Sequence, residues 1–195
     1  MTSTIQKVNV PEGVAGEWRV ERFFISEREA NFANLRATIG HGREGVTSGS
    51  YTKLLRNGAI IMSDTDAEMD DLREMIIRAH GSILINGLGL GVVLQAALQK
   101  LEVTHATVIE MSPDVIKLVG LHYLKRFGSD RLEIIEADAY KWMPPKGIKY
   151  DVVWHDVWDN ICGDNWDSIT SMKRKCARRC HWQGVWAEDA QRQAR

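Results

Sequence analysis

Residues 82–91 read Ser-Ile-Leu-Ile-Asn-Gly-Leu-Gly-Leu-Gly, and the apolar, alanine-rich residues 92–101 follow them directly. A short apolar run, glycines at alternate positions and then helical periodicity predict a buried parallel strand, a tight turn and the start of a helix. Glycine suits such a turn because it adopts positive φ and lets a ligand approach the backbone. The stretch predicts a strand–turn–helix unit that binds a nucleotide. The alternative is a glycine-rich turn that binds nothing.

The spacing of the glycines indicates the class of ligand. Gly87, Gly89 and Gly91 form Gly-x-Gly-x-Gly, whereas a dinucleotide-binding turn would need glycine at position 92, where the chain has Val92. The pattern resembles the first motif of the class I S-adenosylmethionine (SAM) dependent methyltransferase superfamily. The resemblance implies that SAM, which has no pyrophosphate, binds at this turn.

Acidic residues follow the other predicted strands. Glu110, Asp138 and Asp156 each come at the end of a short apolar run, and Glu110 lies nineteen residues after Gly91. An acid about 20 residues beyond the glycines binds ribose hydroxyls in folds of this kind. A single acid is usually a solvated strand end. The carboxyl ends of parallel strands meet at one edge of the sheet, however, and open α/β sheets bind ligands there.

Strands alternate with helical patterns from residue 81 onward, which predicts an α/β fold with a mostly parallel sheet. We assign residues 81–195 to a Rossmann-like SAM-binding domain and residues 1–80 to an N-terminal extension of a strand, a helix, a β-hairpin and a helix. Asn57-Gly58 between two apolar runs predicts the hairpin turn. Ser26 with Glu29 predicts a capping box for the first helix.

Three further segments are predicted less specifically. The first 15 residues, with little periodicity, are expected to be a loose arm. The glycine-rich residues 40–49 form either a lid over the site or, as we favour, a long exposed connection. Residues 63–68 are expected to supply the caps of one helix that runs to about Ala79.

Composition narrows the class of protein. The chain of 195 residues carries 25 basic and 26 acidic residues, so its charge balance indicates neither a nucleic-acid partner nor an acidic membrane surface. It contains no apolar run of membrane-spanning length and no apolar signal core near Met1, which predicts a cytoplasmic protein. Cys162, Cys176 and Cys180 are odd in number and fit reduced thiols. Cys176, Cys180 and His181 on a predicted helix lack a second ligand pair, so no metal site is predicted.

The C-terminal region has an unusual composition. Six of the seven tryptophans lie between Trp142 and Trp186, and basic residues cluster between Lys173 and Arg179. Tryptophan and arginine together are enriched in interaction surfaces, but core tryptophans and a solvated basic helix face are the interpretation that we favour.

The residues from Tyr51 to Asn160 resemble one branch of the superfamily, the spermidine synthase-like proteins (polyamine aminopropyltransferases). The resemblance rests on the hairpin, the glycine motif, Ile109-Glu110, Ala137-Asp138-Ala139 and the segment Tyr-Asp-Val-Val-Trp-His-Asp-Val-Trp-Asp at 150–159. It implies that Asp138 accepts a hydrogen bond from the adenine amino group. It also implies that Asp156 accepts the proton of an attacking amine, with Asp159 as the second acid of the Asp-x-x-Asp segment.

The chain departs from that branch at two points. Spermidine synthases carry an aspartate inside the glycine motif that binds the amine of decarboxylated SAM, and Gly89 stands at that position. Only 39 residues follow Asp156, so the expected sheet is truncated at its C-terminal end, with a very short last strand near residues 184–186. An open sheet edge invites pairing, and we expect a homo-oligomer that uses the tryptophan-rich region.

The predicted function is group transfer from SAM, most simply methyl transfer to a small polar acceptor with an amine or hydroxyl group. Aminopropyl transfer from decarboxylated SAM is the first alternative, and a SAM-binding or structural protein without turnover is the second. Strand alternation sends His155 to the other face of the sheet, where a packed histidine is expected. The predicted catalytic residues are Asp156 and Asp159, and the predicted cofactor site comprises Gly87, Gly89, Gly91, Glu110, Met111, Asp138 and Ala139.

Overall fold

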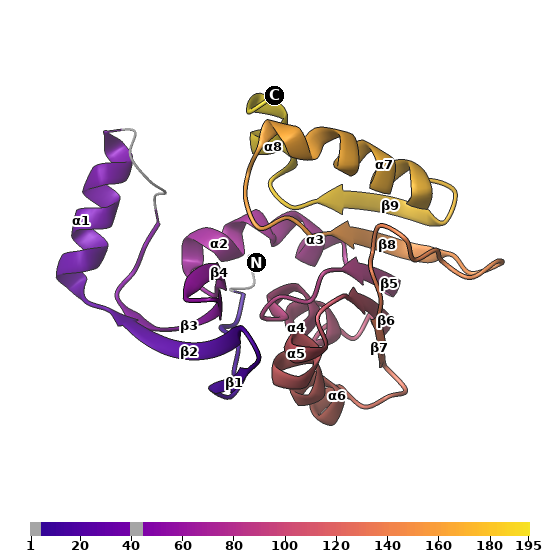
Figure 1. Cartoon of the computed structure of the whole chain (residues 1–195), viewed down its shortest axis with the longest axis horizontal. Coiled ribbons are helices and arrows are strands. Elements are labelled where there is room, and N and C mark those ends of the chain that lie inside the picture. Colours follow the sequence, from indigo (N-terminus) through magenta and orange to yellow (C-terminus); the bar gives the residue numbers. More distant parts are fainter. Residues whose placement is uncertain (1–4, 40–44) are drawn as a thin grey trace.

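The computed structural model describes residues 5–39 and 45–195, which form two β-sheets with helices packed against them (Figure 1). The first sheet is antiparallel and follows the order of the sequence. Its strands are β1 (Gly13–Ala15), β2 (Trp18–Ile25), β3 (Gly49–Arg56) and β4 (Ala59–Ser63). Helix α1 (Glu27–Thr38) connects β2 to β3 and lies at the end of this sheet far from the rest of the molecule.

Both local predictions for this sheet are confirmed. The Ser26 hydroxyl accepts from the Glu29 amide at the start of α1, and the Glu29 carboxylate accepts from the Ser26 amide. Asn57 and Gly58 join β3 to β4 with φ of 50° and 83°. A type I′ turn requires positive φ at both central residues, and asparagine followed by glycine tolerates it best.

The second sheet has five strands, and every neighbouring pair within it is parallel. Its order is β7-β6-β5-β8-β9, so the chain moves outward on one side of β5 and then on the other. The predicted α/β fold is confirmed. This order reverses at β5, and the crevice at the carboxyl ends of β5 and β8 is therefore the expected ligand site. The strands are β5 (Gly81–Asn86), β6 (Val103–Glu110), β7 (Leu132–Glu136), β8 (Tyr150–His155) and β9 (Cys180–Val185).

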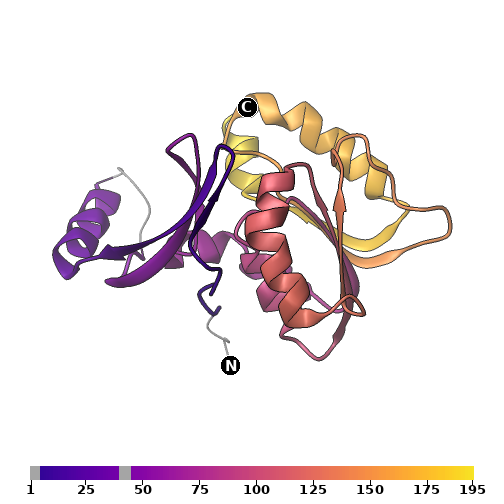
Figure 2. The same ribbon diagram turned by 60° about the horizontal axis from the view of Figure 1, so that its bottom comes forward.

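Helices cover both faces of the parallel sheet (Figure 2). Ile83 and Ile85 of β5 share one core cluster with Tyr123, whereas Leu84 points the other way and shares a second cluster with Ile169. This alternation is what a strand buried on both faces requires. The remaining helices are α2 (Asp66–Asp71), α3 (Arg73–Arg78), α4 (Val92–Leu98), α5 (Pro113–Val115), the π-helical turn η1 (Ile116–Gly120), α6 (Leu121–Phe127), the 3₁₀ turn η2 (Gly163–Asn165), α7 (Trp166–Cys176) and α8 (Glu188–Gln193).

Three sequence-based expectations are wrong. The described part of the arm before β1, residues 5–12, is not loose, because Val8 and Val10 are buried and the Val8 amide donates to Asp64 Oδ2 over 3.0 Å. The single helix expected to run from the capping residues 63–68 to about Ala79 is divided at Leu72 into α2 and α3. The last strand, β9, is six residues long and pairs fully with β8 rather than forming a short fragment. The glycine-rich connection was expected over 40–49, and its residues 40–44 lie outside the described ones.

The core runs without interruption from the first sheet to the second. Val10, Leu54 and Leu72 belong to the same buried cluster as Ile83 and Leu94. The division into residues 1–80 and 81–195 coincides with the change from the antiparallel to the parallel sheet, and it stays a prediction. Within the described ranges, no helix combines the length and apolar character needed to cross a bilayer.

Candidate active site

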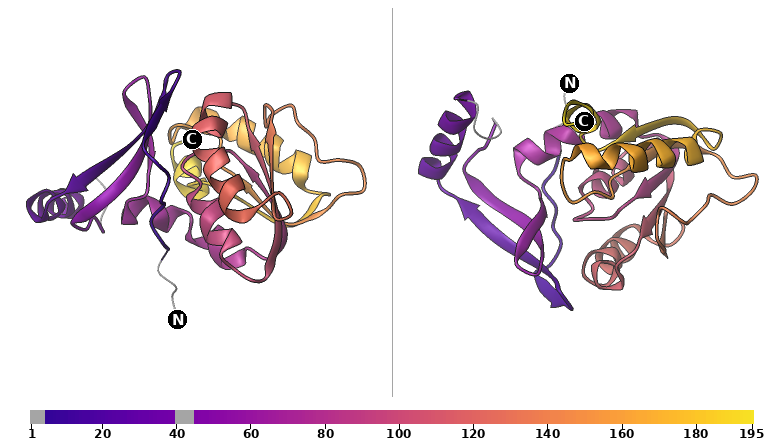
Figure 3. Two further views of the ribbon diagram at one scale, coloured as in Figure 1. Left: turned by 90° about the horizontal axis from the view of Figure 1, so that it is seen from below. Right: turned by 45° about the horizontal axis from the view of Figure 1, so that its top comes forward.

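A cavity of about 450 Å³ opens at the carboxyl ends of the parallel strands. The antiparallel sheet stands beside these strand ends (Figure 3). Its residues Leu54, Arg56 and Met62 line the cavity on that side. The volume is within the usual range of small-molecule sites, roughly 300 to 1,000 Å³. The lining residues are Glu17, Trp18, Leu54, Arg56, Ile61, Met62, Glu68, Leu72, Gly87, Gly89, Ile109, Glu110, Met111, Ser112, Pro113, Asp114, Val115, Asp138, Ala139, Tyr140, Asp156, Val157, Trp158, Asp159 and Trp186.

Eight of the nine residues assigned from the sequence line this one cavity. The exception is Gly91, whose position is explained by packing. A Cβ on Gly91 would overlap the ring of Tyr123, and its φ of 72° is one that other residues rarely adopt. The Tyr123 hydroxyl also donates to the Leu90 carbonyl over 3.0 Å. Gly91 therefore lets α6 pack against the turn, and its assignment as a ligand contact gains no support from the geometry.

Gly87 allows two strand ends to approach each other closely. A Cβ at this position would overlap the backbone carbonyl oxygen of Asp156, and φ is 94°. The Asp156 amide in turn donates to the Asn86 carbonyl over 2.8 Å. The glycine turn and the acid after β8 are thus held together by backbone contacts, which fixes Asp156 beside the turn.

Glu110 is buried at the end of β6 and binds the glycine turn. Its exposed fraction is 8%, and its two carboxylate oxygens accept from the Leu88 amide at 2.9 Å and the Ser112 amide at 2.8 Å. Burial raises the pKa of Glu110, and the amide hydrogen bonds oppose that rise. A carboxylate has about four acceptor positions, so capacity is left for ribose hydroxyls.

Asp138 and Ala139 lie in the turn after β7. Asp138 accepts from the Tyr140 amide at 2.8 Å and pairs with Lys141 at 3.1 Å, and these contacts lower the pKa of Asp138. Ala139 is buried at the cavity wall. Met111 is largely exposed, with a relative exposure of 70%, and lines the cavity next to Glu110.

Asp156 and Asp159 both line the cavity in the segment that follows β8. Asp156 is half-buried, whereas Asp159 is exposed. Burial raises the pKa of Asp156 to about 7; the Trp154 indole partly opposes this rise, and the carboxylates of Asp71 and Glu68 add to it. A carboxyl group with a pKa near neutrality can accept a proton at physiological pH. Asp156 is thus the described group best suited to proton transfer in this cavity.

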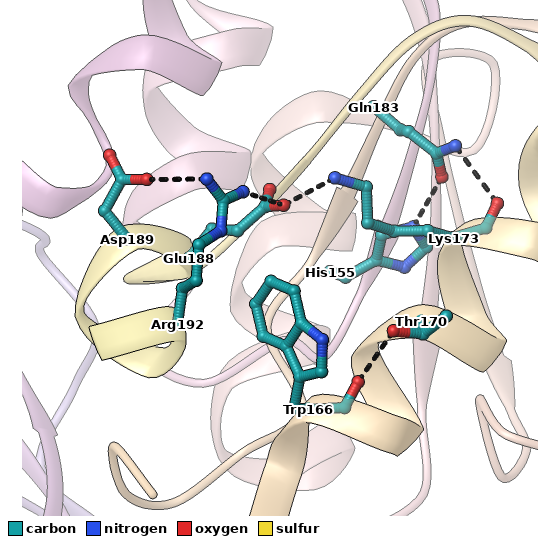
Figure 4. A network of polar contacts seen from close by, with 8 residues as sticks. All are labelled: His155, Trp166, Thr170, Lys173, Gln183, Glu188, Asp189 and Arg192. Carbon is teal, nitrogen blue, oxygen red and sulfur yellow. Dashed lines mark hydrogen bonds and ion pairs between the residues drawn. The ribbon is translucent and has the colours of Figure 1, made fainter. Parts of the chain in front are cut away.

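His155 is fully buried. Strand alternation puts it on the same face of β8 as Val153, which packs in the second core cluster, and on the opposite face from Trp154. Its Nδ1 lies 3.0 Å from the Asn86 side-chain nitrogen. Its Nε2 lies 3.2 Å from Gln183 Oε1 (Figure 4). The amide nitrogen must donate to Nδ1, so Nε2 carries the hydrogen. Burial lowers the pKa of His155 to about 4. The side chain is a neutral link between β5, β8 and β9, not a base facing the cavity.

Sequence reasoning missed the contribution of the antiparallel sheet to the cavity. Arg56 pairs with Glu17 at 2.7 Å, and its guanidinium lies 5.4 Å from the centre of the Trp18 ring. The Met62 sulfur accepts from the Leu90 amide over 3.4 Å and lies against Gly89. The sequence patterns of β3 and β4, which carry Arg56 and Met62, predict the hairpin correctly. They carry no information about whether the antiparallel sheet packs beside the parallel one.

The cysteines lie at the ends of secondary-structure elements or in loops, and the C-terminal tryptophans pack against the core. Cys176 ends α7 and Cys180 begins β9, so the helix expected to carry both with His181 ends earlier. In the part of the chain that is described, no three metal-ligating side chains are grouped to hold an ion. The tryptophans of the C-terminal region pack against the two core clusters, which confirms that part of the favoured interpretation. Lys173 and Lys175 are half-buried and bind Glu188 and the Ala139 carbonyl, so the expectation of a solvated basic face is wrong for these two residues.

Comparison with solved structures gives the fold of the chain. The spermidine synthase from Thermotoga maritima is 15% identical over 78% of this chain and 59% of its own, with a TM-score of 0.52. The 23S rRNA methyltransferase ErmE is 15% identical over 60% and 44%, with a TM-score of 0.47. The plantazolicin methyltransferase BpumL in complex with SAH is 15% identical over 59% and 44%, with a TM-score of 0.44.

This chain thus spans about half the length of the proteins it matches. No family model and no curated protein matches it. At identities this low, structural similarity concerns the architecture alone, and it leaves the substrate and the activity open. Together with the strand order and the glycine turn, the match to the spermidine synthase shows that the chain has the Rossmann-like fold of the class I SAM-dependent methyltransferases.

Proposed function

We propose that the chain is a SAM-dependent methyltransferase that acts on a small amine. The observation that carries the proposal is the position of Asp156, which is half-buried, beside the glycine turn and in the same cavity as Glu110. The cofactor would contact Gly87, Gly89, Glu110, Met111, Asp138 and Ala139. Glu110 fits this role because it is buried, fixed by two amides and still able to accept from hydroxyl groups.

The charge of the cavity favours cationic ligands. Among its described lining residues, seven carry carboxyl groups and one, Arg56, carries a positive charge that is already paired with Glu17. SAM has a sulfonium, and an amine acceptor is also a cation before it loses its proton. A phosphate-rich acceptor would be repelled by the same carboxylates, which supports a small molecule over a nucleic acid.

The chain's own residues would have two tasks in the reaction. SAM, when bound, supplies an activated methyl group that needs no further activation by the protein. Asp156 would accept the proton that the acceptor ammonium loses, so that the nitrogen lone pair forms the new bond to carbon while the carbon–sulfur bond breaks. The cavity walls would align donor and acceptor, and such alignment can account for a large part of the acceleration.

Aminopropyl transfer is the second candidate function. Asp159 lines the cavity together with Asp156, which supports a site with two carboxylates for a polyamine. Against it, the position expected to bind the amine of decarboxylated SAM is Gly89, and the neutral thioether of Met62 lies against that glycine. A protein that binds SAM without turnover is the third candidate.

Calorimetry with SAM, decarboxylated SAM and NAD, followed by product mass, separates these candidates. We expect binding of SAM and its demethylated product, weak or no binding of NAD, and a gain of one methyl group on an amine. An aminopropyl product would support the second candidate, and binding without product from a panel of amines would support the third. Equal affinity for NAD would contradict the cofactor assignment.

We also propose that the chain works in the cytoplasm and without a membrane partner. The three cysteines, Cys162, Cys176 and Cys180, are unpaired, which is in line with a reducing compartment such as the cytoplasm. We propose no membrane partner, because the charge balance of the sequence gives no attraction to acidic lipids.

We also propose a homo-oligomer, with α1 as the contact. Phe32, Leu35 and Ile39 are 61%, 62% and 67% exposed and recur every three or four residues, so they form one apolar stripe. An antiparallel pairing with a second α1 would bring the acidic first turn, with Glu27 and Glu29, close to Arg36 of the other copy. The tryptophan-rich region expected from the sequence points inward instead.

Light scattering tests this contact. Leu35→Glu should convert the wild-type oligomer to a monomer, whereas Ile77→Glu, a change at a similarly exposed residue on α3, should not. An oligomer that persists in Leu35→Glu, or a wild-type monomer at tens of micromolar, would contradict the proposal.

A further inference from the structure

We infer that α7 holds two loops that line the cavity. Lys175 is the positioning residue of the cofactor loop (residues 138–140), and Ser168 is the positioning residue of the acceptor loop (residues 156–159). The inference rests on the proposed function, because it assigns the cofactor to residues 138–140 and the acceptor to residues 156–159. It goes beyond that function by giving the C-terminal helix a task in the reaction.

The acceptor loop is attached near the start of α7. Trp158 lies between Asp156 and Asp159, lines the cavity and has an exposed fraction of 9%. Its indole nitrogen donates to the Ser168 hydroxyl over 2.9 Å, and that hydroxyl donates to the Asn165 carbonyl over 2.7 Å. Ser168 therefore fixes the orientation of the one buried aromatic side chain between the two acids.

The cofactor loop is attached near the end of the same helix. The Lys175 ammonium donates to the Ala139 carbonyl. Burial lowers the pKa of Lys175, and the nearby Asp138 carboxylate partly opposes this shift. Asp138, Ala139 and Tyr140 all line the cavity, so this contact sets the position of the wall where the adenine would lie.

Both attachment points are on one face of a well-fixed helix. Ser168 and Lys175 are seven residues apart, which corresponds to about two turns and about 10 Å along the axis. Ile169, Met172 and Cys176 anchor α7 in the second core cluster. Gln183 donates to the Lys173 carbonyl over 3.0 Å, and Lys173 pairs with Glu188 of α8 at 2.6 Å (Figure 4). Each loop is thus attached to the same fixed element by its own polar contact.

The two contacts should have separable effects. Lys175→Met removes the donor to Ala139 and keeps most of the side-chain volume, so the affinity for the demethylated cofactor should fall about 2- to 12-fold with the acceptor KM unchanged. Ser168→Ala removes the acceptor of the indole, so the acceptor KM or kcat should change by a similar factor with cofactor affinity unchanged.

The experiment measures calorimetric affinity for the demethylated cofactor, acceptor kinetics and amide hydrogen exchange in each variant of the full chain. Arg174→Met and Ser171→Ala are matched controls, because both residues are exposed on α7. Exchange should rise in residues 137–141 of Lys175→Met and in residues 156–162 of Ser168→Ala, whether or not turnover is found. Ser168→Thr should restore the wild-type values.

Equal changes in both parameters in both variants would indicate general destabilisation and overturn the inference, as would no change in either. A wild-type chain that binds neither SAM nor its product would defeat the proposed function and this inference with it. A wild type that binds the cofactor while both variants behave like their controls would defeat the inference alone.

Discussion

Asp156→Asn tests the proposed chemistry most directly, because the change removes proton acceptance and keeps nearly the same shape. With a pKa of about 7, the wild-type carboxyl group is about half ionised at pH 7. It is roughly 1% ionised at pH 5, because two pH units correspond to a factor of about 100. General-base catalysis contributes roughly 10²- to 10⁴-fold to a rate. The wild type should therefore exceed the variant by about 100-fold or more above pH 8.

The ratio of the two rates at each pH is the quantity to measure. The acceptor amine has its own ionisation, which affects the wild type and the variant equally and cancels in the ratio. Measured as kcat/KM for SAM, which reports the protein before the cofactor binds, that ratio should fall about 100-fold between pH 9 and pH 5, with its midpoint near pH 7. SAM affinity should stay within a few fold, because Asp156 faces the acceptor in this proposal.

A control and two outcomes make the test decisive. Asp164→Asn changes an exposed carboxyl group in η2, and its rate ratio to wild type should stay near one at every pH. A ratio that is large but independent of pH would show that Asp156 positions the acceptor without taking its proton. Turnover that survives Asp156→Asn intact would show that the acceptor binds elsewhere.

Three further predictions concern binding and stability. Glu110→Ala should weaken SAM binding by about 1.5 to 3 kcal/mol, through the loss of two charge-assisted hydrogen bonds, and unchanged affinity in calorimetry would remove Glu110 from ribose recognition. Gly91→Ala should lower the free energy of unfolding, measured by urea titration, several times more than Gly128→Ala does. Both glycines have positive φ, but of the two only Gly91 lies where a Cβ would overlap the ring of Tyr123. Burial raises the folded-state pKa of Asp156 above its unfolded value, so wild-type stability should decrease as pH rises from about 4 to 7, and Asp156→Asn should lose that part of the pH dependence in thermal unfolding.

The sequence predicted the parallel sheet well because its signals are local. Residues 82–91 contain a buried strand and its turn, and the acids at Glu110, Asp138 and Asp156 mark the ends of three further strands. Parallel strands align their carboxyl ends, so these residues had to meet at one edge. The cavity lined by eight of the nine predicted residues follows from that rule and needs no knowledge of tertiary packing.

The sequence was least informative where packing decides the outcome. The role of Gly91 depends on Tyr123, which is far along the chain and approaches only when α6 packs on the turn. Val8 and Val10 lie in a stretch without periodicity, yet Asp64 and the core hold them in place. The docking of Met62 and Arg56 at the cavity likewise depends on one sheet packing beside another. No local pattern in the chain encodes that choice.

Carboxylates on the opposite side of the cavity affect the ionisation of Asp156, and therefore the reaction. Glu68, from the helix after the antiparallel sheet, raises the pKa of Asp156 together with Asp71, so ionisation of Asp156 is hindered while the cavity lacks a cation. A bound sulfonium would offset this repulsion and lower the pKa of Asp156. By linkage, an ionised Asp156 would strengthen binding of the same cation by the same factor. Cofactor binding and activation of the base are therefore coupled, and the pH profile of kcat should have a lower midpoint than that of kcat/KM for SAM, which reports the protein before the cofactor binds.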